Sequence, residues 1–326
     1  MSWSAVAFLI VSCIGAVYCI LYIFLALLSP PSITYTPEEC FYVSTQGQKK
    51  PQPLPSLSDI AGLDLSVVIP AYNEALRLPP MLRTTLQHLL SSDSPPRSFE
   101  IIIVDDGSTD GTVNAALSFP IPPRRSSQSA LQADLRVVKL SRNKGKGAAV
   151  KHGFLHSRGR RILMVDADGA SRFEDLELLW KEMDRIEVDG QAIAVGSRAH
   201  LVGTDAVVKR SFIRNFLMHG LHFCLRTFGV GHIWDTQCGF KLFSRESARS
   251  LFPTMHISHW IFDVELLLLA RILNIPVAEV PIAWHEVEGS KINLVMDSIG
   301  MLRDLIVLRA NYAIGRWKIQ EREKQD

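Results

Sequence analysis

The chain has 326 residues, 47% of them hydrophobic, which is enough for one large core and for one or two domains. Lysine and arginine total 35 and aspartate and glutamate total 33, so the formal net charge is +2 and does not indicate a nucleic-acid partner. The five cysteines match neither the spacing of a zinc site nor a disulfide framework, and we interpret them as free thiols in a reducing compartment.

The first predicted element is a membrane span. Residues 6–28 carry no charge and form a run long enough to cross a hydrocarbon core of about 30 Å as a helix, and the two prolines that follow end it. The run is too long for a cleaved secretory signal, and no basic residue precedes it. Residues 1–29 are therefore predicted to be a signal anchor. Lys49 and Lys50 beyond the span favour a cytosolic location for the rest of the chain.

Residues 30–64 form the predicted connector between the span and the large domain that follows. The stretch contains proline, serine and glutamine, which favours irregular structure. Phe41, Tyr42 and Val43 in its middle are apolar, so this part could instead pack on the domain that follows.

Beyond residue 64, strand-like and helix-like segments alternate. Short β-branched runs lie at residues 65–70, 100–105, 135–140, 161–166 and 192–197, and helical patterns lie at residues 78–91, 146–156 and 175–186. This alternation predicts an α/β domain with a Rossmann-like, mostly parallel sheet and helices on both faces. Ligands of such sheets bind beyond the carboxyl ends of the strands.

Four polar motifs fall at strand ends or at a helix start. They are Pro70-Ala71-Tyr72-Asn73-Glu74, Asp105-Asp106-Gly107-Ser108, Asn143-Lys144-Gly145-Lys146-Gly147 and Asp166-Ala167-Asp168-Gly169. Each alone could be an ordinary turn or a helix start. Their joint occurrence in this order predicts that they converge on one crevice. No G-x-G-x-x-G motif follows the first strand, which argues against a dinucleotide-binding dehydrogenase.

In this order the motifs resemble those of the family-2 glycosyltransferases of the GT-A fold, over residues 65–291. The resemblance implies a nucleotide-sugar donor and a divalent cation, Mg²⁺ or Mn²⁺, that neutralises the departing diphosphate. Hard carboxylate oxygens suit either ion. The resemblance also implies that Asp168 is the direct metal ligand and that Asp166 contacts the ribose or the metal.

The other donor-site residues are assigned in the same way. The resemblance places Asp106 around the nucleoside, together with Pro70, Tyr72 and Glu74. Asp105 and Asp106 are adjacent, and one of them should accept hydrogen bonds from the base or the ribose. Lys146 opens a predicted helix, where a helix N-terminus and a cation could both face phosphate, although a solvated lysine fits as well.

Later segments narrow the resemblance. Residues 196–200, 235–241, 260–265 and 288–291 are similar to those of the dolichyl-phosphate β-glucosyltransferases. The resemblance implies transfer of glucose from UDP-glucose to dolichyl phosphate, with inversion, on the cytosolic face of the endoplasmic reticulum. The product, dolichyl β-D-glucosyl phosphate, supplies glucose for N-glycan precursor assembly.

Two alternatives remain open. One is a polyprenyl-phosphate mannosyltransferase that uses GDP-mannose; it shares the early motifs but differs around residues 235–241. The other is a non-catalytic homologue that binds lipid or nucleotide sugar, against which the intact Asp106, Asp166 and Asp168 argue.

The acceptor side needs cations more than a strong base, because a phosphate monoester has its second pKa near about 6 and is mostly ionised. The candidate phosphate ligands are Arg198, Arg210, Arg214, Lys241 and Lys291. Arg210 and Arg214 lie four residues apart on a predicted helix, so both can face one phosphate. Arg198, Arg210 and Arg214 could each instead form a surface salt bridge.

Three carboxylates complete the candidate set: Asp235, Asp263 and Glu265. Of the whole set, Asp263, Asp235 and Arg198 are the candidate catalytic residues. On a helix that opens at Ser258, Asp263 and Glu265 do not share a face. In the wider family a carboxylate here orients the acceptor or acts as a base, and we assign that role to Asp263. The alternative is a helix-end carboxylate.

Asp235 is expected to order the loop that follows it, near the donor. Cys238 is interpreted as a small packing residue, because inversion by direct displacement needs no protein nucleophile.

Two apolar stretches point to the lipid. Residues 292–313 carry four charges, which excludes an ordinary span, and residues 292–326 are predicted to form an amphipathic interface helix and a charged tail. Its apolar face holds Val295, Ile299, Leu302, Ile306 and Ala313. Residues 212–228 form the second stretch. Either could lie on the bilayer and guide the prenyl tail, or could pack on the catalytic core.

Overall fold

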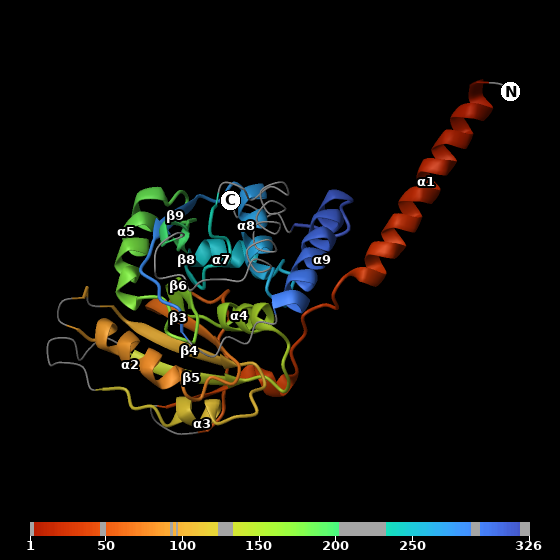
Figure 1. Ribbon diagram of the computed structural model, residues 1–326. Coiled ribbons are helices and arrows are strands. Elements are labelled where there is room, and N and C mark those ends of the chain that lie inside the picture. The colour runs from red at the N-terminus through yellow and green to blue at the C-terminus, as the bar shows by residue number, and fades with distance from the viewer. Residues whose placement is uncertain are drawn as a thin grey trace.

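The computed structural model describes residues 3–45, 50–91, 94–95, 97–122, 133–201, 233–287 and 294–319. Figure 1 shows an α/β body from which one long helix, α1 (Trp3–Leu28), projects. This helix is the one candidate membrane span among the described residues, by its length and composition. Nearly all of its side chains are exposed, as a lipid-facing helix requires, and the predicted apolar helix is confirmed.

The described residues form a nine-stranded sheet in the order β2-β1-β5-β4-β3-β6-β8-β7-β9. The strands are β1 (Phe41–Ser44), β2 (Gln52–Pro53), β3 (Leu63–Ala71), β4 (Phe99–Asp105), β5 (Ala133–Lys139), β6 (Gly159–Val165), β7 (Ile193–Ser197), β8 (Phe240–Ser244) and β9 (Val277–Pro281). The central strands β5, β4, β3 and β6 are parallel, as predicted. Their apolar runs are nearly continuous because both faces of the sheet are covered.

The sheet is mixed rather than mostly parallel. β8 runs antiparallel to both β6 and β7, and β1 runs antiparallel to β5. The sequence did not predict β8, because its apolar run is interrupted by Lys241, nor β9, whose residues are only partly buried. A buried charge of this kind is tolerated only where the fold supplies a partner, and that partner lies outside the strand.

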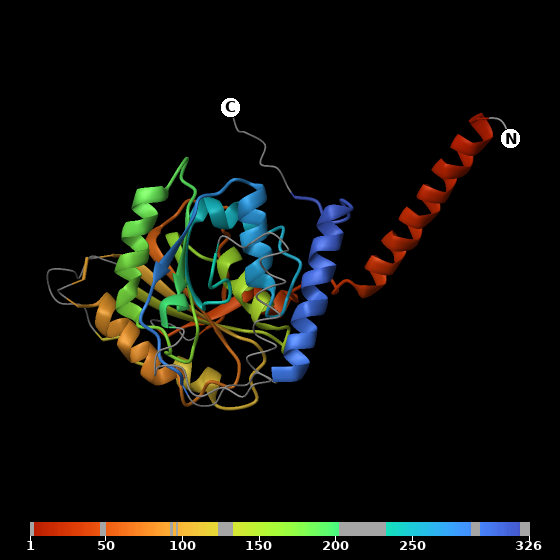
Figure 2. The same ribbon diagram turned by 45° about the horizontal axis from the view of Figure 1, so that its top comes forward.

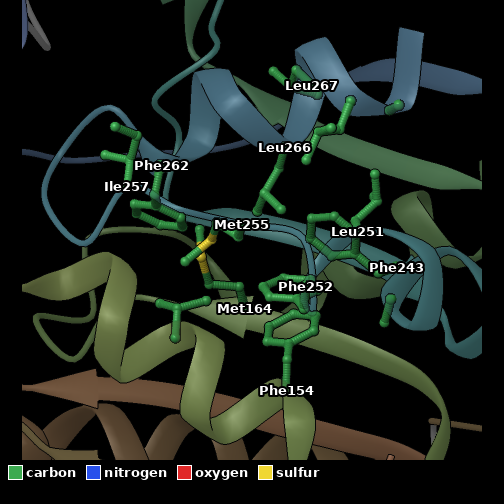
Figure 3. Packing of buried hydrophobic residues seen from close by; sticks show 14 of the residues in the cluster. Phe154, Met164, Phe243, Leu251, Phe252, Met255, Ile257, Phe262, Leu266 and Leu267 are labelled. Carbon is green, nitrogen blue, oxygen red and sulfur yellow. The ribbon is translucent and has the colours of Figure 1, made fainter. Parts of the chain in front are cut away.

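Helices cover both faces, as predicted. One face carries α2 (Leu78–Leu89), α3 (Thr112–Leu117) and α5 (Leu176–Ile186), and the other carries α4 (Lys146–Leu155), α7 (Arg245–Leu251), α8 (Phe262–Ile272) and α9 (Leu294–Ala313). Two separate clusters of buried apolar side chains fill the two interfaces. In one of them, shown in Figure 3, Phe154 stacks on Phe252 with 3.9 Å between ring centres. Phe154 also meets Phe243 edge-on, with 5.2 Å between ring centres.

The helix expected to open at Ser258 begins four residues later, at Phe262. The residues before it form a loop because the buried carboxylate of Glu265 accepts hydrogen bonds from the backbone N–H groups of His256 and Ile257. Glu265 also accepts from the hydroxyl of Tyr312 in α9. This carboxylate therefore fixes the loop and joins it to α9.

The connector contributes to the sheet. The apolar run of residues 41–43, whose packing the sequence left open, forms strand β1, which pairs with β5, and Tyr42 is buried. A short 3₁₀ helix, Pro37–Cys40, precedes it. Residues 37–44 are thus part of the catalytic body.

Helix α9 packs on the body with one side and exposes the other. Leu305 and Leu308 are buried, whereas Ile299 is 60% and Ile306 is 50% exposed. The end of α9 meets the end of α1: the Ser29 hydroxyl accepts hydrogen bonds from Asn311 and Arg316, and both views place α9 between α1 and the rest of the body (Figures 1 and 2). The C-terminal end of α9 therefore adjoins the foot of the candidate span.

Candidate active site

The polar motifs meet where the parallel strands end, which we call the carboxyl edge of the sheet. Ala71 at the end of β3 pairs with Asp105 at the end of β4, and the Asp106 N–H donates to the Ala71 carbonyl at 2.8 Å. In the loops that follow, the Asn73 N–H donates to Ser108 Oγ at 2.8 Å. The first two motifs are thus one hydrogen-bonded unit, as the convergence of strand ends predicts.

Within the first motif, the residues differ in accessibility. Pro70 is buried in β3, and Tyr72 is partly exposed. Glu74 pairs with Arg77, whose Nε donates to Glu74 Oε2 at 2.7 Å. Arg77 was not among the predicted site residues. Its pKa is raised, first by the hydrogen bond to Glu74 and further by the charges of Asp168 and Asp166, so it lies within electrostatic reach of both.

The two acids of the second motif are both buried and have different partners. Asp105 accepts from the Ser108 N–H at 3.1 Å, and burial raises its pKa. Asp106 accepts from the backbone N–H groups of Lys144 and Gly145, at 2.7 and 2.9 Å, and burial raises its pKa to about 6. Asp106 therefore holds the third motif in place through its backbone. Its contact with a nucleoside stays a prediction.

The third motif reaches the fourth through an ion pair. Lys146, the first residue of α4, places Nζ 2.6 Å from Asp166 Oδ1 and 5.7 Å from the centre of the Trp260 ring. Burial lowers the pKa of Lys146, but the charges of Asp166 and Asp263 outweigh this effect and raise it. Lys146 is therefore a charged member of the site and not a solvated lysine.

Asp166 and Asp168 form the pair on which a cation site depends. Burial raises the pKa of Asp168, and the neighbouring charge of Asp166 raises it further, which is the mark of like charges held together. A side chain at Gly239 would occupy the place of the Asp166 carboxylate, since a Cβ there would lie 2.0 Å from Oδ2. The glycine thus keeps that place open for the acid.

These residues fit a divalent ion that is completed by substrate. Among the described residues, no three His, Cys, Asp or Glu side chains gather as a complete metal site. Mg²⁺ is commonly held by one or two carboxylates together with substrate phosphates, which is what Asp166 and Asp168 can offer. The repulsion between the two carboxylates is the kind that a cation relieves.

A second cluster lies beside this pair. Arg198 makes two hydrogen bonds to Asp235, from Nε at 2.7 Å and from Nη2 at 2.8 Å, and its backbone N–H donates to the same carboxylate at 2.9 Å. Asp235 thereby orders the start of the loop after β7, and Arg198 is oriented by it. Arg198 also feels the charge of Asp166, so the two clusters adjoin.

Lys241 and Asp263 form a buried ion pair with an Nζ–Oδ1 distance of 2.6 Å. Burial raises the pKa of Asp263, while Lys241 and Lys146 oppose that rise, which places Asp263 near Lys146. The partner that allows a lysine inside β8 is therefore Asp263, 22 residues further along the chain.

Other predicted residues have simpler outcomes. Cys238 is buried, and burial raises its pKa to about 12, so its thiol is protonated and packs as a small apolar group. Arg210, Arg214 and Lys291 lie outside the described residues, as do the apolar stretch 212–228 and the motif at 288–291.

A cavity of about 510 Å³ lies at the opposite edge, where the parallel strands begin, near the start of β6. Four arginines line it: Arg160, Arg161, Arg245 and Arg249. Arg161 pairs with Asp184 and Glu187, and Arg245 donates to the carbonyls of Ser157, Gly159 and Asp59. The guanidinium groups of Arg161 and Arg245 are therefore committed to the fold.

Comparison with known proteins shows the family to which the chain belongs. The sequence pattern described as Glycosyl transferase family 2 matches residues 66–252. A crystal structure of glucosyl-3-phosphoglycerate synthase from Mycobacterium tuberculosis in complex with uridine diphosphate has the same fold, with a TM-score of 0.50 at 19% identity over 78% of this chain and 81% of that one. The chain belongs to glycosyl transferase family 2 and is a glycosyltransferase of the GT-A fold, as predicted.

Similar proteins show to which group within this family the chain belongs. A dolichyl-phosphate beta-glucosyltransferase of Dictyostelium discoideum is 46% identical over 93% of this chain and 92% of the relative. Those of Saccharomyces cerevisiae and Homo sapiens are 43% and 40% identical, over 95% and 91% of this chain and 93% and 90% of the relatives. The chain is a member of the dolichyl-phosphate beta-glucosyltransferase family, which confirms the narrower resemblance.

Proposed function

We propose that this protein transfers glucose from UDP-glucose to dolichyl phosphate with inversion, forming dolichyl β-D-glucosyl phosphate for N-glycan precursor assembly. The names of its relatives support the acceptor and the sugar. The observation that carries the proposal is the meeting of Asp166, Asp168 and Lys146 at one edge of the sheet, where a diphosphate can be held.

Asp168 and Asp166 would hold a divalent cation, Mg²⁺ or Mn²⁺. When bound, such an ion neutralises the charge that develops on the departing diphosphate. Lys146 contributes a further positive charge at the start of α4, where a helix N-terminus also favours phosphate. Glu74 and Arg77 lie on the nucleoside side, with Pro70, Tyr72, Asp105 and Asp106.

On the acceptor side, the chain has to position a phosphate that is already ionised. Arg198 is suited to this role because Asp235 fixes the plane of its guanidinium group. Asp263 would line the cleft and orient the acceptor. Lys241 is buried against Asp263, so we assign it to holding that carboxylate. Arg210, Arg214 and Lys291 complete the proposed phosphate ligands.

Helices α1 and α9 support a proposal for the membrane arrangement. We assign α1 to a single span of the endoplasmic reticulum membrane, with the catalytic body on the cytosolic side. The exposed apolar side of α9, which includes Met296, Ile299, Leu302 and Ile306, would rest on the bilayer beside the foot of the span. This seat brings the site to the surface at which a lipid phosphate is presented.

The experiment uses the full-length protein in mixed micelles with dolichyl phosphate and Mg²⁺, and compares labelled UDP-glucose with labelled GDP-mannose. We expect a glucolipid from UDP-glucose alone, with a β linkage and no turnover in excess EDTA. Transfer from GDP-mannose would favour the mannosyltransferase alternative, and an α linkage would contradict inversion. Donor binding without turnover of either donor would favour a non-catalytic homologue.

A further inference from the structure

Residues 34–40, which join the membrane helix to β1, form a strap across the helix that carries Lys146. We infer that Glu39 in this strap is a positioning residue for the donor site, because its carboxylate holds the loop from which α4 and Lys146 start. The inference rests on the proposed role of Lys146 in binding the donor diphosphate.

Glu39 is only 1% exposed, and its carboxylate is fully occupied. Oε1 accepts from the Ser141 N–H at 2.8 Å and from the Ser141 hydroxyl at 2.7 Å. Oε2 accepts from Lys144 Nζ at 2.7 Å and from the Thr36 N–H at 2.8 Å. Burial alone would raise the pKa of Glu39, but these hydrogen bonds outweigh it and lower the pKa to about 2. The group is therefore a charged brace between the strap and the loop.

Further contacts bind the strap to α4. The Tyr35 hydroxyl donates to the Ala148 carbonyl at 2.7 Å, and the ring of Tyr35 packs on His152 with 4.0 Å between ring centres. His152 Nε2 lies 2.8 Å from the Glu39 carbonyl, and Lys144 Nζ also donates to the Thr34 carbonyl at 2.8 Å. The strap thus follows the first two turns of α4.

The loop of residues 141–145 is held from two sides. Glu39 accepts hydrogen bonds from Ser141 and from the Lys144 side chain. Asp106 accepts hydrogen bonds from the backbone N–H groups of Lys144 and Gly145. Gly145 has a φ of 99°, and a Cβ there would lie 2.4 Å from the Ser258 carbonyl oxygen, so the loop has little freedom to shift. Lys146 follows directly and reaches Asp166. Release of the Glu39 side would leave this loop held through Asp106 and the contact with Ser258.

The chemistry of Glu39 makes a small substitution informative. All four of its hydrogen-bond partners are donors, so the site needs two acceptor oxygens. A glutamine has one oxygen and an NH₂ group, and in either orientation that group faces at least one N–H donor, from Ser141 on one side or from Thr36 and Lys144 on the other. Glu39→Gln therefore loosens the loop with almost no change of volume and leaves the charge of Lys144 without its carboxylate.

Glu38 provides a matched control. It neighbours Glu39 in the same 3₁₀ helix but is exposed. Glu38→Gln removes the same charge at almost the same distance from the site, so a difference between the two variants reports the brace and not the net charge.

The test measures UDP affinity with Mn²⁺ by calorimetry, KM for UDP-glucose, kcat and the thermal midpoint, for both variants of the full-length protein in detergent. We expect Glu39→Gln to weaken UDP binding and to raise KM by about tenfold, with kcat affected less. Glu38→Gln should stay within about twofold of the wild type. Ser141→Ala, which removes one donor and no charge, should lie between them, and it serves if Glu39→Gln fails to fold.

A Glu39→Gln protein that loses thermal stability but keeps wild-type UDP affinity would overturn the inference, because Glu39 would then be purely structural. Equal effects of Glu38→Gln and Glu39→Gln would also overturn it. These outcomes differ from a failure of the proposed function, in which the wild type itself would bind UDP without turnover.

Discussion

The two edges of the sheet differ in how their charges are satisfied. At the edge with the 510 Å³ cavity, Arg161 pairs with carboxylates and Arg245 donates to backbone carbonyls, and these contacts stabilise the fold. At the carboxyl edge, Asp166 and Asp168 repel each other, and Lys146 reaches one of them. A cavity lined by cations is therefore not by itself a ligand site. The functional edge is the one where charge remains for a ligand to balance.

The largest effect is expected from Asp168→Ala, because it removes the proposed direct ligand of the cation. Loss of several kcal/mol of transition-state stabilisation corresponds to a fall in kcat of about 1000-fold. The measurement is glucolipid formation at saturating UDP-glucose. Asp184→Ala at the opposite edge removes an equivalent charge and should keep wild-type activity. Undiminished activity of Asp168→Ala would remove this residue from the mechanism.

A smaller loss is expected from Lys146→Met, which keeps the length of the side chain and deletes its charge. We expect kcat/KM for UDP-glucose to fall by about 100-fold, since one preorganised charge at the departing diphosphate is removed. Lys181→Met, on the exposed side of α5, is the matched control. If both variants behave alike, Lys146 does not contact the diphosphate.

The contact of α9 with the bilayer should affect activity less than Lys146 does, and only through the lipid substrate. The double variant Ile299→Asn with Ile306→Asn removes apolar area from the exposed side of α9. We expect binding to vesicles and turnover of dolichyl phosphate to fall by about tenfold, with UDP affinity unchanged. Leu178→Asn with Val188→Asn makes an equal change on exposed apolar residues of the body. Equal losses in both double variants would show that α9 has no special contact with the bilayer.

The smallest effect is expected at the cavity on the opposite edge. Arg160 is largely exposed and makes a long contact of 3.3 Å with Asp64. Arg160→Gln should change kcat/KM by less than about twofold, because exposed ion pairs contribute little. Steady-state kinetics with UDP-glucose is the measurement. A large loss would mean that this cavity takes part in the reaction and that the comparison of the two edges is wrong.

The sequence predicted the central strands and the acids at their ends because both depend on local pattern. Asp166 and Asp168 follow a buried run, and parallel strands bring such ends to one edge. The sequence did not reveal β8, because Lys241 looks unsuited to a core until its partner Asp263 is in place.

Long-range partners explain why the sequence did not reveal Glu39. Glu39 lies in a stretch predicted to be irregular, and its partners Ser141 and Lys144 lie 102 and 105 residues further along the chain. Arg77 was missed although its spacing of three from Glu74 is a local signal for an ion pair. Pairings across the fold, rather than residue types, decide which charged groups brace the site and which ones face the ligand.

We propose that Asp166 and Asp168 hold a cation together with the diphosphate of the donor. Its most direct test is calorimetric titration of UDP with and without Mn²⁺, for the wild type and for Asp168→Asn. Because the protein ligands alone are incomplete, Mn²⁺ should bind the wild type weakly by itself and tighten UDP binding by more than about tenfold, reciprocally. Asp168→Asn should lose that tightening. Equal tightening in the two proteins would contradict the account.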